Sequence, residues 1–217
     1  MMSAEQHLGI LQQPRLGHTQ AGSVLWLLGP TSSGKTTLAT RAIAKLRHNG
    51  VPAVLFDGDE VRGFFGPDYG FDPDHRLRVV SVLVHLANKA AAAGLHVIVA
   101  ALTAGNEARE YVRDNVNNLK MGYVSCSIAT CAQRDPKGLY AKAILGEIET
   151  LVGYNSAYRP LDNPDIVLDT ELNSVDDLVS LIVAPYLEQL CAPVTTLNRC
   201  RMSNPENEKS DAPDAAN

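Results

Sequence analysis

Several protein classes are excluded by what the sequence lacks. The four cysteines form no CxxC pair and stand near no histidine cluster at metal spacing, which favours reduced thiols in a cytoplasmic protein over a disulfide framework or zinc site. The chain has 19 basic and 24 acidic residues, and its net charge of −5 argues against nucleic acid or an anionic membrane as the main partner, because both require a broad basic surface. The longest apolar run, residues 90–102, contains Gly94 and His96 and is too short to cross a bilayer. Cys131 is predicted to be a buried helix residue rather than a nucleophile.

The two ends of the chain differ from its middle. Residues 1–21 show no sustained period and no basic segment followed by a long apolar run, so we expect a loose leader, docked through Leu8, Ile10 and Leu11, and not a signal peptide. Residues 192–217 are rich in proline, asparagine, serine and charge, which predicts a disordered tail. One domain over residues 22–191 is therefore expected.

Apolar runs alternate with helical patterns between these ends. Strands are predicted at 23–28, 51–56, 95–102, 122–128 and 166–169, and helices at 36–48, 77–93, 106–119 and 175–190, with a helix or lid at 135–149. The strands show no polar alternation, so both faces of the sheet should be buried. The pattern predicts an α/β fold of three layers, with a mostly parallel sheet covered by helices on both faces.

A phosphate-binding loop follows the first predicted strand. Residues 29–36, GPTSSGKT, match GxxxxGK[ST] and open a helix, which is the context of a P-loop. Its backbone N–H groups can cradle phosphates, Lys35 can reach the β- and γ-phosphates of ATP, and the Thr36 hydroxyl can bind Mg²⁺. A helix-capping turn is the alternative. The expected ATP-binding residues here are Gly29, Pro30, Thr31, Ser32, Ser33, Gly34, Lys35, Thr36 and Thr37.

A carboxylate cluster ends the second predicted strand, in the run DGDEVR. Ligands of such sheets bind beyond the carboxyl ends of the strands, so this run should face the P-loop. Asp57 is expected to hold the metal, and Asp59 to orient or deprotonate an attacking hydroxyl. Arg62 could bind an anionic acceptor. An acidic surface turn is the alternative.

Six motifs carry a family resemblance: GPTSSGKTTLA, LFDGDEVR, GFDPDHR, AGLHVIVAALT, RDPKGLYAKAILGEIETLVGYNS and NPDIVLDT. They resemble adenylylsulfate (APS) kinases nearly collinearly from Val24 to Leu190. The resemblance implies a P-loop kinase that moves the γ-phosphate of ATP onto a ribose 3′-hydroxyl of a nucleotide. It also implies a homodimer.

The resemblance assigns further roles by position. Asp59 becomes the catalytic carboxylate beside Lys35, and Arg62, Phe71 and Arg76 become acceptor-binding residues, because arginine forks bind anions and an aromatic face stacks on a base. Asp57 lies on the same substrate side. Thr103 stands where the family carries a serine, and we expect its hydroxyl to form hydrogen bonds rather than a covalent intermediate. The nucleotide-side lid, about residues 134–158, is implied to bring Arg134 and Lys137 to ATP and Lys142 to the substrate.

The acceptor side departs from the family pattern. Changed positions are Val79 for asparagine, residues 101–106 for FISPYR, Ile144 for arginine, Leu151 for phenylalanine, Asn155 for aspartate and Ala157 for proline. These changes remove hydrogen-bonding and stacking groups, so APS and another nucleotide-linked alcohol both stay open as acceptors. Cytidine diphosphoramidate kinases are also similar to this chain.

Two other functional classes are weighed. A GTPase should carry a guanine-reading N/TKxD, which the sequence lacks. An ATP-binding pseudoenzyme that serves as a partner module stays open because of the altered acceptor side, although Lys35, Thr36, Asp57 and Asp59 are all present.

Overall fold

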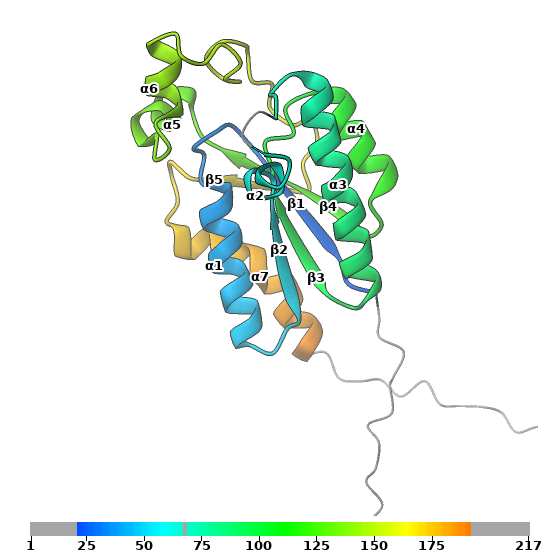
Figure 1. Ribbon diagram of the computed structural model, residues 1–217. Coiled ribbons are helices and arrows are strands. Elements are labelled where there is room, and N and C mark those ends of the chain that lie inside the picture. Colours follow the sequence, from blue (N-terminus) through cyan, green and yellow to red (C-terminus); the bar gives the residue numbers. More distant parts are fainter. Residues whose placement is uncertain (1–20, 67–68, 192–217) are drawn as a thin grey trace, which may run out of the picture.

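The computed structural model describes residues 21–66 and 69–191 (Figure 1). The expected leader, apart from Ala21, and the expected tail lie outside them, as do Leu8, Ile10 and Leu11. In chain order the elements are β1 (Val24–Leu28), α1 (Lys35–His48), β2 (Ala53–Asp57), α2 (Gly58–Gly63), α3 (Pro73–Ala92), β3 (His96–Ala100), α4 (Asn106–Asn115), β4 (Leu119–Ser125), α5 (Ile128–Arg134), α6 (Leu139–Ile144), β5 (Ile166–Asp169) and α7 (Val175–Cys191).

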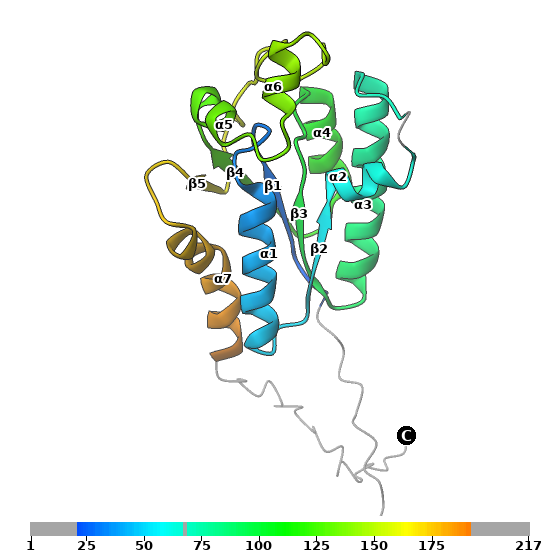
Figure 2. The ribbon, with the colours of Figure 1, turned by 60° about the vertical axis from the view of Figure 1, so that its left-hand side comes forward.

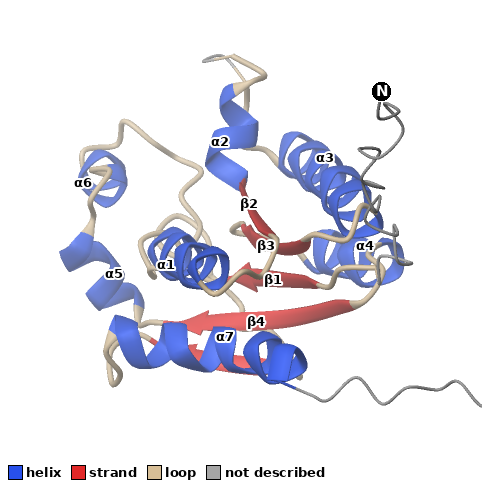
Figure 3. Ribbon diagram, turned by 90° about the horizontal axis from the view of Figure 1, so that it is seen from below, coloured by secondary structure: helices blue, strands red, loops and turns tan. Residues whose placement is uncertain are grey.

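The sheet is parallel throughout, in the order β2-β3-β1-β4-β5. Helices α1 and α7 cover one face, and α3 and α4 cover the other (Figure 3). This arrangement confirms the predicted three-layer α/β fold. Among the described residues, no helix is long and apolar enough to span a bilayer.

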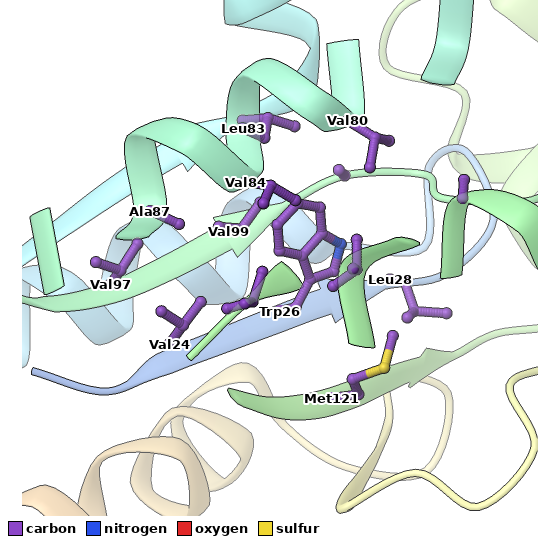
Figure 4. Packing of buried hydrophobic residues seen from close by; sticks show 14 of the residues in the cluster. Val24, Trp26, Leu28, Val80, Leu83, Val84, Ala87, Val97, Val99 and Met121 are labelled. Atoms are coloured by element: carbon purple, nitrogen blue, oxygen red, sulfur yellow. The ribbon is translucent and has the colours of Figure 1, made fainter. Parts of the chain in front are cut away.

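The central strand β1 shows why its sequence has no polar alternation. All five of its residues are buried. Val24, Trp26 and Leu28 join the cluster under α3 and α4, whereas Leu25 and Leu27 join the cluster under α1 and α7. Trp26 lies among valines and leucines from α3, β1 and β3 (Figure 4). A strand buried on both faces must be apolar at every position, which the sequence shows.

The predicted boundaries of α4 and β4 were wrong, for local reasons. The helix predicted at 106–119 ends at Asn115, because the chain turns through Asn118, whose φ is +49°. Strand β4 then runs from Leu119 to Ser125 rather than over 122–128, since the Ser127 hydroxyl accepts a hydrogen bond from Thr130 N and caps α5.

The other helices differ in their starts and in their number. Helix α3 begins at Pro73, one turn before the predicted start at 77, because the Asp72 side chain caps it through His75 N. The segment predicted as one helix or lid at 135–149 contains only the short α6, and α2 was not predicted. Cys131 is fully buried in α5, as predicted.

The fold gathers the functional loops at one end. All five strands point the same way, so their carboxyl ends meet at one edge of the sheet. The P-loop, α2 and the segment with α5 and α6 lie at that edge, with α5 and α6 above β1 and α1 (Figure 2).

Candidate active site

The P-loop links the end of β1 to the start of α1. A Cβ on Gly29 would lie 2.5 Å from Val124 O, so only glycine allows this close approach to β4. Gly34 has φ +101° directly before the helix. Lys35 Nζ donates hydrogen bonds to Gly29 O (3.0 Å) and Pro30 O (2.6 Å), so its ammonium group lies within the loop. Burial lowers the pKa of Lys35 to about 8, although the nearby carboxylate of Asp59 opposes this effect.

Asp57 connects the P-loop to α2. Its Oδ2 accepts a hydrogen bond from Thr36 Oγ1 (2.7 Å), and its Oδ1 accepts one from Asp59 N (2.8 Å), which caps the helix. Two hard oxygen donors, the Thr36 hydroxyl and the Asp57 carboxylate, therefore lie side by side, as a magnesium site needs. Among the described residues, no group of three or more His, Cys, Asp or Glu side chains gathers as a metal site. Any magnesium here would need phosphate and water oxygens as further ligands.

Asp59 and Lys137 face each other across the cleft. Their carboxylate and ammonium groups form an ion pair between α2 and the turn before α6. Both side chains are more than half exposed, so solvent screens the pair and an incoming ligand can reach either group. The sequence-predicted catalytic carboxylate thus meets a sequence-predicted lid residue directly.

Two arginines and one aromatic ring form the acceptor side. The Arg62 guanidinium lies 4.4 Å from the centre of the Phe71 ring and donates to Gly70 O. Arg76 donates through Nη2 to Thr150 O (2.7 Å), and its buried Nη1 has no hydrogen-bond partner among the residues that the structure describes. Burial lowers the pKa of both arginines, yet an arginine keeps its charge. A small movement of the Arg76 side chain would turn this Nη1 donor toward an anionic ligand in the cleft.

Thr103 occupies an unusual backbone position beyond β3. Its φ of +41° is left-handed, which is rare for a β-branched residue, and only 5% of the residue is exposed. Trp26 Nε1 donates to Thr103 Oγ1 (3.0 Å), and Arg109 Nε donates to Thr103 O (3.0 Å). Sequence reasoning assigned no role to Trp26 or Arg109. Arg109 is itself buried on α4, and no signal in the sequence separates it from the exposed arginine Arg113 on the same helix.

Hydrogen bonds link the start of the lid segment to the P-loop. Arg134 donates to Thr170 Oγ1 (2.9 Å) and Thr170 O (2.7 Å), and the same hydroxyl donates to Ser33 O (3.1 Å). From α6, the Tyr140 hydroxyl donates to Thr31 O (3.2 Å). Arg134 therefore lies beside the phosphate loop, where it can meet a nucleotide.

A cleft of about 1830 Å³ joins the P-loop side of the site to its acceptor side. It brings together most predicted site residues: Thr31, Ser32, Gly34, Lys35, Thr36, Thr37, Asp57, Asp59, Arg62, Phe71, Arg76, Thr103, Arg134 and Lys137. Gly29, Pro30 and Ser33 contribute the loop backbone behind them. Lys142 is exposed on α6 and lies outside the cleft lining.

The departures from the family pattern divide between the cleft and the lid surface. Val79, Ala101, Leu151 and Ala157 line the cleft, so its acceptor side lacks the amide and the aromatic rings that the resemblance implies there. Ile144 and Asn155 do not line it; Asn155 Oδ1 instead accepts a hydrogen bond from Leu151 N within the lid (3.1 Å).

Comparison with known proteins agrees with this geometry. Residues 21–169 match the family model "Adenylylsulphate kinase". The chain is 35% identical over 162 residues to a probable adenylyl-sulfate kinase of Pyrococcus abyssi, covering 75% of this chain and 93% of that protein. It is 33% identical to the adenylyl-sulfate kinase of Staphylococcus carnosus, over 82% of this chain and 88% of that one.

A solved structure is similar in three dimensions. The APS kinase of Mycobacterium tuberculosis, in complex with AMPPNP and APS, superposes with a TM-score of 0.72 at 31% identity, covering 77% of this chain and 98% of that chain. The family model, the related sequences and the similar fold show that the chain belongs to the adenylylsulphate kinase family.

Proposed function

We propose that this protein transfers the γ-phosphate of ATP to the 3′-hydroxyl of adenylylsulfate, giving 3′-phosphoadenylylsulfate and ADP. The observation that carries the proposal is the single cleft in which a P-loop faces two arginines and an aromatic ring. Both substrates must meet in one space for direct transfer, and this cleft offers a polyphosphate site and an anion-and-base site. The solved relative with AMPPNP and APS supports the same pair of ligands.

The ATP half would be held by the phosphate loop and its neighbours. The loop backbone and Lys35 would bind the β- and γ-phosphates, with Arg134 and Lys137 closing on the nucleotide from the lid. Thr36 and Asp57, already joined at 2.7 Å, would hold Mg²⁺. Bound there, the ion would neutralise charge on the phosphates.

The acceptor half would use Arg62, Arg76 and Phe71. The two guanidinium groups would bind the anionic group of the acceptor, and the unpaired Nη1 of Arg76 offers a donor for it. Phe71, with half of its surface exposed, would stack on the base. The Thr103 hydroxyl already accepts from Trp26, so its own proton is free to donate to the acceptor.

The transfer step would run in line. The acceptor oxygen attacks the γ-phosphorus, the bond to the β,γ-bridging oxygen breaks, and ADP leaves. Asp59 would orient the acceptor hydroxyl and accept its proton, after the ion pair with Lys137 has opened. Lid closure would keep water from the phosphoryl group.

The cellular setting is inferred from the chain itself and from the resemblance. Two buried free thiols, Cys126 and Cys131, suit a reducing compartment, so a cytoplasmic location is proposed. A homodimer is proposed from the family resemblance alone.

A coupled assay with competing acceptors tests the proposal. ADP release is measured with APS, cytidine diphosphoramidate and nucleoside monophosphates, with Lys35→Ala as the inactive control. APS should give the highest kcat/KM. The loss of an amide at Val79 and of an aromatic ring at Leu151 favours a second candidate, another nucleotide-linked alcohol, and faster turnover of cytidine diphosphoramidate would establish it. ATP binding without turnover of any acceptor would favour the pseudoenzyme.

A further inference from the structure

Arg109 is a buried cation held by three backbone carbonyls. Only 4% of the residue is exposed. Its Nε donates to Thr103 O (3.0 Å), Nη1 to Pro160 O (3.0 Å) and Nη2 to Arg159 O (2.6 Å). Among residues 21–66 and 69–191, no carboxylate forms an ion pair with it. Burying a charge is costly unless it is paired and hydrogen-bonded. The three carbonyl contacts of Arg109 therefore call for a physical reason.

The three carbonyls belong to two different parts of the site. Thr103 follows β3 and lines the cleft, whereas Arg159 and Pro160 lie where the chain leaves the lid and returns to β5. The ring of Tyr158, the last lid residue, lies 5.7 Å from the guanidinium carbon. One planar group therefore joins the downstream end of the lid to a residue that faces the substrates.

Thr103 needs such support. A β-branched residue at φ +41° is strained, and that conformation persists only where neighbours impose it. Trp26 holds the side chain of Thr103 and Arg109 holds its carbonyl. Removing the Arg109 contact leaves the carbonyl unpaired and lets the backbone relax toward a common conformation, which would turn the hydroxyl away from its present direction.

We propose that Arg109 is a positioning residue that couples the lid to Thr103, so that lid closure and presentation of the Thr103 hydroxyl to the acceptor occur together. Arg109 is absent from the cleft lining, so it acts through Thr103 and residues 158–160. The inference rests on the proposed phosphotransferase function. Loss of Arg109 should therefore affect binding and turnover of the acceptor and should leave ATP binding at the P-loop unchanged.

Helix α4 provides a matched control. Arg113, one turn further along, donates through Nη2 to Asp162 O (3.0 Å) and is exposed. It ties the same helix to the same returning segment but does not contact Thr103. If Arg109 only anchored that segment, the two substitutions should have related effects. If Arg109 positions Thr103, only its loss should affect the acceptor.

The test compares wild type, Arg109→Ala and Arg113→Ala in steady-state kinetics with ATP and APS varied separately. For Arg109→Ala we expect kcat/KM for APS to fall by on the order of 10- to 100-fold, the effect typical of a misplaced group, with KM for ATP within about twofold. ADP should also be formed in excess of phosphorylated acceptor, because a lid that is no longer coupled to Thr103 lets water reach the γ-phosphate. Arg113→Ala should match wild type.

Two additions keep the proposal testable if Arg109→Ala is poorly folded. Arg109→Lys retains the charge but cannot reach three carbonyls from one ammonium group, so it should show the same selective acceptor defect at near-normal Tm. Guanidinium ion at millimolar concentration should partly restore acceptor turnover of Arg109→Ala. Equal losses for ATP and APS, losses that merely follow Tm, or unchanged APS kinetics would each overturn the proposal.

Failure of the proposed function is separable from failure of this inference. If wild type phosphorylates none of the acceptors, the function is wrong. The coupling is then measured by the change in Trp26 fluorescence on addition of AMPPNP, since the indole is bonded to Thr103. A change that occurs in wild type and Arg113→Ala but is lost in Arg109→Ala would support the coupling; an equal change in all three would overturn it.

Discussion

Asp59 and Lys137 form an ion pair that spans the cleft, from the start of α2 to the turn before α6. Each partner is needed elsewhere in the proposed reaction: the carboxylate for the acceptor hydroxyl, and the ammonium group for the nucleotide phosphates. The ion pair therefore lets each charge offset the other. Binding of ATP would draw Lys137 toward phosphate and free Asp59.

Asp59→Asn should separate chemistry from binding. The amide keeps the size of the side chain but cannot accept a proton, so kcat should fall by about 10²- to 10⁴-fold. The dissociation constant for ATP should stay within about threefold, and stability should change by less than about 1 kcal/mol, because the ion pair is exposed. Rapid-quench kinetics and equilibrium nucleotide binding measure the two effects. Near-wild-type turnover would remove Asp59 from the mechanism.

Lys35 should make ATP binding depend on pH. Its pKa of about 8 means that the ligand-free protein loses this charge as pH rises above 8, so affinity should fall by up to about tenfold per pH unit there. Titration with ATP between pH 7 and 9.5 measures the slope, and Lys35→Arg, always charged, should give a flat profile. A flat wild-type profile would contradict the assignment.

The lowered pKa of Lys35 affects folding stability in the opposite direction to ATP affinity. Between pH 8 and the ordinary Lys35 value of 10.5, the unfolded chain holds more protons than the folded one. The contribution of Lys35 to stability therefore rises with pH in that window, while ATP affinity declines.

Thr103→Val should destabilise the protein through Trp26. Valine has nearly the same shape but cannot accept a hydrogen bond, so the buried indole N–H loses its partner at a cost of about 1–3 kcal/mol. Thr103→Ser keeps the oxygen and should stay close to wild type. Denaturant unfolding measures both variants, and Trp26, the only tryptophan, reports the change by fluorescence. Equal stabilities for the two variants would show that the bond contributes little.

Phe71→Ala should weaken the acceptor and not ATP. Loss of one stacked ring costs about 1–3 kcal/mol, which corresponds to about a 5- to 150-fold higher KM for the acceptor. Phe64 is the matched control, because it is 83% exposed and does not line the cleft. An unchanged acceptor KM in Phe71→Ala would place the base elsewhere.

The sequence predicted those parts of the site that are contiguous. The P-loop and the run from Asp57 to Arg62 each carry several groups within eight residues, and their local geometry follows from glycine, helix start and strand end. Their meeting at one edge follows from a parallel sheet. For that reason Lys35, Asp57 and Asp59 could be predicted to lie together.

Parts that depend on distant contacts could not be predicted. Trp26 and Thr103 are 77 positions apart, and Arg109 reaches Arg159 across 50 positions. Until it is known which distant segments meet, core packing explains a tryptophan in a buried strand. Exposure to solvent likewise explains an arginine on a polar helix. Lys142 is the converse case, because the turn that places Lys137 in the cleft leaves Lys142 exposed on α6.

The most direct test follows the phosphate itself. Purified protein is incubated with ATP labelled in the γ-phosphate, Mg²⁺ and APS, and the nucleotide products are separated and identified, with Lys35→Ala alongside. One labelled product is expected, the 3′-phosphorylated adenylylsulfate, in equal amount to ADP and absent with Lys35→Ala. Label that appears only as inorganic phosphate, or on no acceptor at all, would contradict it.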